Sequence, residues 1–134
     1  MLKVVKTVKE HLDKIKIQLE QIDEFVNVDI EGMHSIVDDD GNVFVLWKGV
    51  IWWQGRGTFR AFIAADSGKH FLSIIRIFKI LYDKYAPERL EVEICDSFDN
   101  AKRLVEFFGF KKESVMKKFY AGKDYCMYVK FRGE

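Results

Sequence analysis

The sequence predicts a mixed α/β fold, with a central strand–helix–strand unit and a C-terminal hairpin. Two segments with the character of strands, Thr58–Asp66 and Arg89–Cys95, flank a long apolar helix at Lys69–Tyr85. Strands joined by such a helix lie parallel in a right-handed crossover. The last two strands, Phe110–Tyr120 and Tyr125–Arg132, are separated by a short turn with a glycine, which predicts an antiparallel pair.

Length and composition place the chain among globular proteins. Its 134 residues predict one domain, residues 1–134, that is long enough to bury a core. Hydrophobic residues make up 49% and charged residues 32%, which excludes a disordered chain. The net charge of +1 argues against a dedicated nucleic-acid-binding protein, which usually has a basic excess. No apolar run approaches the ~20 residues that a membrane-spanning helix needs.

Cysteine and histidine usage argues against disulfides and metal. Cys95 and Cys126 are the only cysteines, and without a signal peptide ahead of them we expect reduced thiols in a cytoplasmic protein. The three histidines are scattered and no Cys-x-x-Cys motif exists, so zinc is not expected. The acidic turn Asp38–Gly41 lacks the spacing of a calcium loop, because Ile36 and Trp47 stand where acidic ligands are needed. We therefore expect no metal site.

The N-terminal segments predict an edge strand and one long helix. Leu2–Lys6 has the character of a short strand. Thr7 and Glu10 have the spacing of a capping box. An apolar stripe at helical spacing then predicts a continuous helix as far as Phe25. The stripe consists of Val8, Leu12, Ile15, Leu19 and Ile22.

A hairpin follows, and two groups of side chains near it could serve a ligand. The predicted strands are Met33–Val37 and Asn42–Trp53, and Gln54–Gly57 is a flexible turn. Three tryptophans either pack in the core or form the wall of a substrate pocket. Two acids in the preceding helix either contact a cationic substrate or are plain surface residues. These side chains are Trp47, Trp52 and Trp53, and Asp23 and Glu24.

The junction of Thr58–Asp66 with the following helix is a candidate anion site. The strand ends in the small residues Ala64 and Ala65, and a turn with one glycine leads into the helix. The first N–H groups of a helix lack acceptors, and together with the helix dipole they bind anions. Lys69 and His70 add positive charge there. The alternative is an ordinary strand-to-helix turn.

The central strand Arg89–Cys95 alternates apolar and polar residues and runs into a short amphipathic helix. Asp96 and Ser97 offer oxygens that can cap the start of this helix, and Gly109 ends it. The segment Asp99–Phe110 resembles the Ala-x-x-Leu-Tyr-x-x-x-Gly-Phe segment of GNAT-type N-acetyltransferases. The matching residues are Ala101, Leu104, Gly109 and Phe110.

The predicted order of elements is similar to that of GNAT proteins over essentially the whole chain. More narrowly, it resembles short acetyltransferase-like proteins of bacteriophage genomes. The sequence departs from the family pattern in three places. The Arg/Gln-x-x-Gly-x-Gly/Ala loop is absent, Val105 stands where a general-acid tyrosine is frequent, and Phe98 stands where an asparagine often begins the helix.

The resemblance implies a GNAT-like acyl-CoA N-acyltransferase fold with acetyl-CoA as cosubstrate and an amine as acceptor. It places the pyrophosphate over the turn before the long helix and the pantetheine arm along the end of the preceding strand. The cofactor-binding residues are then Ile63, Ala64, Ala65, Ser67, Gly68, Lys69, His70 and Phe71. Small side chains at the strand end let the arm approach the backbone and pair with it.

Direct acetyl transfer needs a base for the amine, a donor near the thioester oxygen and an acid for the thiolate. Glu93 is the first choice for the base, followed by Glu91 and Asp96. Tyr120, Ser97 or water replaces the missing tyrosine acid. Cys95 lacks a matched His/Asp pattern and is not expected to be a nucleophile. The expected catalytic residues are Glu93, Asp96 and Tyr120.

Two alternatives to an enzyme stay open. A protein with this fold but without catalysis could serve as a binding component or as a phage virion-associated component. An unrelated α+β interaction domain is the other alternative. The sequence specifies neither the acceptor amine nor the oligomeric state.

Overall fold

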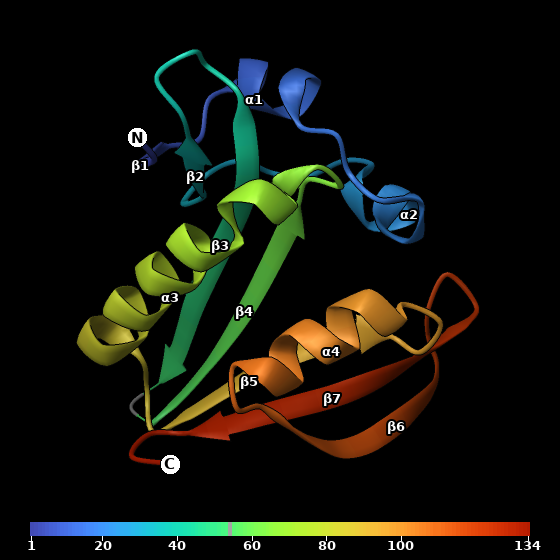
Figure 1. Ribbon diagram of the computed structural model, residues 1–134. Helices are drawn as coiled ribbons and strands as arrows, with labels where there is room; N and C mark the ends of the chain where they lie inside the picture. Colours follow the sequence, from blue (N-terminus) through green and yellow to red (C-terminus); the bar gives the residue numbers. More distant parts are fainter. Residues whose placement is uncertain (54) are drawn as a thin grey trace. The chain divides into compact units, whose positions relative to one another are not determined.

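The computed structural model describes residues 1–53 and 55–134 and confirms the predicted mixed α/β fold (Figure 1). Within these described residues, seven strands form one sheet in the order β1-β2-β3-β4-β5-β7-β6. The strands are β1 (Lys3–Lys6), β2 (His34–Val37), β3 (Val43–Trp53), β4 (Arg56–Ile63), β5 (Arg89–Cys95), β6 (Lys111–Tyr120) and β7 (Lys123–Phe131). The helices are α1 (Lys9–Lys14), α2 (Ile22–Phe25), α3 (Phe71–Tyr85) and α4 (Asp99–Phe107), with single 3-10 turns η1 (Leu19–Gln21) and η2 (Ser67–His70).

The central strand–helix–strand unit has the predicted direction. β4 and β5 are parallel, and their register runs from Arg56 opposite Arg89 to Thr58 opposite Glu91. β6 and β7 are antiparallel, as predicted for the C-terminal hairpin. β7 is also antiparallel to β5. β4 begins before the predicted strand because Arg56 and Gly57 already belong to it. Of the predicted turn at 54–57, residue 54 lies outside the described residues.

Contacts divide the chain into two compact units. Unit 1 consists of Met1–Gly49 and Ala61–Tyr85, and unit 2 consists of Val50–Arg60 and Ala86–Glu134. A single domain over residues 1–134 stays a prediction.

Unit 1 buries both faces of its part of the sheet. On one face, residues of the β2–β3 hairpin and β4 pack with Ile15 and with partly buried residues of the N-terminal segments. On the other face, Ile36, Phe44 and Val45 pack against Ile74 and Ile77 of α3. The long apolar helix therefore forms because one side of it covers this sheet.

The predicted continuous helix up to Phe25 is wrong. The chain leaves the helical conformation at Ile15, whose φ and ψ are −72° and 133°. Ile15 is 7% exposed because it enters the core, whereas Leu19 of the same predicted stripe is 79% exposed. Burial of Ile15, together with hydrogen bonds to β4 described below, overrides the helical periodicity of the sequence.

The predicted capping box is also wrong, because the hydroxyl of Thr7 bonds to another strand. Thr7 Oγ1 lies 2.7 Å from Ser35 Oγ, and Ser35 Oγ lies 2.8 Å from Nδ1 of His11. The same Nδ1 accepts the backbone N–H of Val8 at 3.3 Å. Burial, with a smaller contribution from the charge of Lys14, lowers the pKa of His11. This polar cluster joins the start of α1 to β2.

In unit 2, α4 ends as the sequence predicts. Gly109 has φ +95°, and its N–H donates to the carbonyl of Glu106. The N–H of Phe110 donates to the carbonyl of Val105, which completes a Schellman motif. Lys130 of β7 donates to the carbonyl of Phe108 at 2.6 Å and so fixes the end of α4 to the hairpin.

Gly109→Ala is expected to lower the free energy of unfolding by about 1–2 kcal/mol, because an L-residue pays a steric penalty in the left-handed region. An added Cβ would also lie 2.7 Å from Nζ of Lys130, which would have to move. Urea unfolding checks the value. Gly68→Ala is the control, since an added Cβ there meets nothing within 4 Å. Equal unfolding midpoints for the two variants would contradict the proposed role of Gly109.

Candidate functional site

In unit 1, the candidate anion site lies where η2 continues into α3. The N–H of Ser67 donates to the carbonyl of Ala64, and the N–H of Phe71 donates to the carbonyl of Gly68. The single 3-10 turn η2 runs directly into α3, so its start is the N-terminus of a continuous helical segment, where the first N–H groups lack acceptors within the helix. A Cβ at Gly68 would meet open space. This end of the helix has the geometry to accept an anion.

The two predicted cations at this turn have different surroundings. The ring of His70 packs edge-on against Phe44 of β3, with 4.5 Å between the ring centroids. Lys69 is exposed. Phe71, which begins α3, is 38% exposed. Lys69 is therefore the side chain of the turn that is best suited to meet a soluble anion.

The end of β4, assigned by sequence to the pantetheine arm, is hydrogen-bonded to the chain itself. The N–H of Ala64 donates to Phe44 of β3 at 2.8 Å, whereas the N–H of Ala65 donates to the carbonyl of Lys16 at 2.7 Å. Ile17 and Ala64 form an antiparallel bridge. The side chain of Gln21 adds a bond from Nε2 to the carbonyl of Ala61 at 2.9 Å. This pairing could not be predicted from the sequence, because the periodicity of residues 8–25 predicts a helix there.

In unit 2, Glu93 lies on β5 opposite Met127 of β7. Its side chain is 23% exposed, and its Oε2 lies 3.3 Å from Nη2 of Arg60 on β4. Arg60 was missed by the sequence analysis. A signal was present, because Arg60 lies on one strand of the predicted parallel pair and acids stand at alternate residues of the other, which suits cross-strand pairing.

Asp96 lies on the side of β5 where α4 packs, and an ion pair engages its carboxylate. Lys102 of α4 contacts Asp96 at 2.8 Å, and Cys126 donates its S–H to the same oxygen at 3.2 Å. The hydrogen bond from Lys102, followed by that from Cys126, lowers the pKa of Asp96. A lowered pKa makes the carboxylate a weaker base. The predicted side-chain caps at Asp96 and Ser97 are wrong, since Phe98 is the N-cap residue and no side-chain bond caps the helix.

Tyr120 lies at the tip of the β6–β7 hairpin and is 46% exposed. Its ring packs edge-on against Tyr125, with 6.3 Å between the centroids, and Tyr125 lies opposite Cys95 of β5. Tyr120 therefore reaches the same end of β5 as Glu93. Among the predicted catalytic residues, unit 2 brings Glu93 and Tyr120 to one end of the strand, and Asp96 faces α4.

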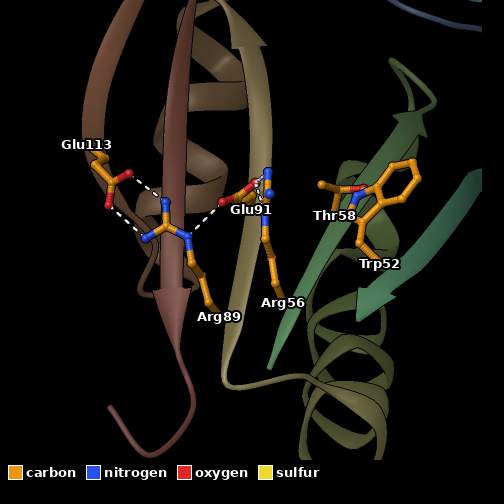
Figure 2. A network of polar contacts seen from close by, with 6 residues as sticks. All are labelled: Trp52, Arg56, Thr58, Arg89, Glu91 and Glu113. Atoms are coloured by element: carbon orange, nitrogen blue, oxygen red, sulfur yellow. Dashed lines mark hydrogen bonds and ion pairs between the residues drawn. The ribbon is translucent and has the colours of Figure 1, made fainter. Parts of the chain in front are cut away.

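Glu91, the second choice for the base, is the centre of an ion-pair network (Figure 2). It is 4% exposed. Arg56 contacts its Oε1 at 3.0 Å, and Arg89 contacts its Oε2 at 2.7 Å. Arg89 also binds both carboxylate oxygens of Glu113 on β6. Both oxygens of Glu91 are thus engaged by guanidinium groups, which leaves Glu93 as the better candidate base.

Core packing fits Trp47 but neither of the other two tryptophans. Trp47 stacks on His34 and packs with the core of unit 1. Trp52 and Trp53 are 60% and 66% exposed, so core packing does not account for them. Trp52 donates its indole N–H to the hydroxyl of Thr58 at 3.2 Å, and Trp53 lies 5.9 Å from the guanidinium of Arg56.

No group of three or more His, Cys, Asp or Glu side chains within residues 1–53 and 55–134 is arranged to hold a metal ion. Both cysteines are free thiols. Burial, and then the bond to Asp96, raises the pKa of Cys126. In the part of the chain that the structure describes, no helix is long and apolar enough to cross a membrane.

Neither a protein-family model nor a curated protein matches the sequence. Solved structures do match it, at low sequence identity. The GNAT-family acetyltransferase from Bacillus anthracis has a TM-score of 0.73 and 10% identity, covering 99% of this chain and 96% of that one. Ard1 from Thermoplasma volcanium has a TM-score of 0.75 and 11% identity, with 99% of both chains covered.

A chimera of the spermidine N-acetyltransferase SpeG from Vibrio cholerae and hSSAT has a TM-score of 0.73 and 14% identity, covering 97% of this chain and 95% of that one. The likeness thus extends over nearly the full length of each chain. It agrees with the parallel β4–β5 pair and the C-terminal hairpin described above. The chain has the fold of the GNAT acetyltransferases.

Proposed function

We propose that this protein is an N-acetyltransferase that transfers the acetyl group of acetyl-CoA directly to an amine. The observation that carries the proposal is the junction of β4, η2 and α3, where a helix N-terminus follows a strand in a fold shared with a spermidine N-acetyltransferase. We take the acceptor to be an amine because one of the matching structures is named a spermidine N-acetyltransferase. Its identity is left to experiment.

Unit 1 supplies the cofactor-binding part of this proposal. The turn Gly68–Phe71 holds the pyrophosphate at the N-terminus of the helical segment, and the Lys69 side chain adds a positive charge. The open space beside Gly68 fits such a group. Ser67 and Phe71 border the turn. Ile63 and Ala65 offer backbone to the pantetheine arm, whereas Ala64 contributes only its small side chain because its N–H is donated to Phe44. The N–H of Ala65 is not available to that arm in this structure, because it is donated to the carbonyl of Lys16.

Unit 2 supplies the acid–base part. Acetyl-CoA brings an acyl group activated as a thioester, so the protein has to position it and to move protons. Glu93 accepts the proton of the attacking amine, and Arg60 at 3.3 Å holds its carboxylate in place. Tyr120, exposed at the hairpin tip, is the candidate proton donor. Asp96 has the lesser part because Lys102 engages it.

CoA binding tests the cofactor assignment. Lys69→Glu is expected to weaken CoA binding by about tenfold to a hundredfold, because it replaces a charge-assisted bond with repulsion. Isothermal titration calorimetry at up to millimolar CoA measures the effect. Lys79→Glu is the matched control, since Lys79 is also an exposed lysine of the α3 segment. If the parent protein gives neither heat nor a thermal shift with CoA, the assignment is lost.

A further inference from the structure

The edge of β4 that points away from β3 is covered in unit 1 by Lys16–Gln21, which we call the strap. Successive residues of a strand direct their N–H and C=O groups to opposite edges. Ala64 bonds to Phe44 of β3, so Ala61, Ile63 and Ala65 use the other edge. At this edge the strap accepts the N–H of Ala65 through Lys16, and it donates to the carbonyl of Ala61 through Gln21.

We propose that the strap is an autoinhibitory segment, which must leave β4 before acetyl-CoA can bind fully. The inference rests on the proposed function, because it concerns the same strand end that the pantetheine arm would use. One N–H of Ala65 cannot be donated to Lys16 and to the arm at the same time. The strap and the arm therefore compete for the backbone of residues 61–65.

The contacts of the strap suit a segment that opens and closes. It is short and lies between helices of six and four residues, α1 and α2. Leu19 in its middle is 79% exposed. The ion pair of Lys16 with Asp66, at 3.6 Å, is exposed and contributes little to holding it closed. Gln21 is the exception, because it is 7% exposed and its amide is bonded to β4.

Removing the Gln21 bond should therefore favour the open strap. The apparent affinity for a ligand is the intrinsic affinity multiplied by the fraction of protein in the state that can bind it. Gln21→Leu keeps the buried volume but loses the donor, and one hydrogen bond of this kind shifts the equilibrium roughly two- to tenfold. CoA should bind tighter by this factor in calorimetry. Glu20→Gln, at an exposed position of the same turn, should bind CoA like the parent.

A disulfide that holds the strap against β4 provides the opposite test, because it favours the closed state; we call this variant the lock. Ile17 and Ala64 are bridge partners whose flanking residues, Lys16 and Ala65, carry the hydrogen bond. Such non-hydrogen-bonded pairs have Cα atoms about 4.5 Å apart, a spacing within the range of disulfides. The double variant Ile17→Cys/Ala64→Cys should bind CoA more weakly when oxidised than when reduced. The same protein in two redox states is its own control.

The outcomes separate the inference from the proposed function. If the oxidised lock binds CoA as tightly as the reduced form, the strap does not inhibit and the inference is overturned, while CoA binding stands. If the reduced double variant fails to fold, the single variants decide: equal CoA affinities of Gln21→Leu and Glu20→Gln overturn the inference. If the parent and Gln21→Leu both fail to bind CoA, the proposed function fails and the inference falls with it.

Discussion

Replacing Glu93 with glutamine is expected to lower kcat/KM for acetyl transfer by about 10²–10⁴-fold, because a positioned base contributes about that much to a rate. This corresponds to roughly 3–5 kcal/mol of activation free energy. The neutral amide cannot accept the proton of the amine, although it fills the same space. The dissociation constant of CoA should stay unchanged, since Glu93 is assigned no part in binding it.

Steady-state kinetics with an accepted amine, combined with CoA titrations, measures both quantities. Glu106→Gln is a suitable control, because Glu106 is an exposed acid of α4 in the same unit. A Glu93→Gln variant that acetylates the amine as fast as the parent would show that the base is another group. In that case a water molecule or a further carboxylate would have to be tested.

Replacing Glu91 with glutamine is expected to have the largest effect on stability. It removes the carboxylate that Arg56 and Arg89 share, at the three-residue parallel ladder between β4 and β5. Removing one partner of a fully buried pair costs about 3–5 kcal/mol. Because the side chain of Arg56 is 43% exposed, water compensates part of this loss. We expect the free energy of unfolding to fall by about 2–3 kcal/mol.

Chemical denaturation of Glu91→Gln and Glu113→Gln side by side measures this difference. Glu113 binds the same Arg89, but its side chain is 44% exposed, so its loss should cost about 1 kcal/mol or less. Equal destabilisation by the two variants would contradict the central place of Glu91 in the network (Figure 2).

The network also predicts how stability depends on pH. Burial disfavours the charged form of Glu91, but the bonds from Arg89 and Arg56 and their charges outweigh it and lower its pKa. A carboxyl whose pKa is lower in the folded state stabilises the fold at pH values above the ordinary value of 4.5. This contribution is lost as the pH falls from there through the folded-state pKa. Glu91→Gln should therefore show a smaller loss of stability than the parent on acidification below that value.

The strand–helix–strand unit was predictable because its signals are local and agree with one another. The alternation of β5, the length of α3 and the glycine after α4 each indicate the element that forms. The N-terminal helix was not predictable in the same way. Its apolar stripe has helical spacing, but Ile15 gains more from the core, and Lys16 gains a partner on β4 that lies about fifty residues away in sequence.

Candidate residues for the site could be named from the sequence, but their arrangement in space could not be predicted from it. A strand that runs directly into a helix predicts an anion site at the helix N-terminus, and the assignment of the cofactor to it stays a prediction. Which of the two carboxylates is accessible depends on the register between β4 and β5. Glu91 and Glu93 share one face of β5, and only their arginine partners on β4 distinguish them. The contact of the strap with the end of β4 could not be predicted either. A hydrogen bond between Lys16 and Ala65 leaves no mark in the pattern of either segment.

The most direct test of the proposed function is acetyl transfer itself. The protein is incubated with acetyl-CoA and a panel of amines that includes polyamines, amino acids and peptide N-termini, and the products are analysed by mass spectrometry. We expect an acetylated product from at least one amine, formed in proportion to protein and strongly reduced with Glu93→Gln. CoA binding without acetylation of any amine in the panel would contradict catalysis and would indicate a binding protein with this fold.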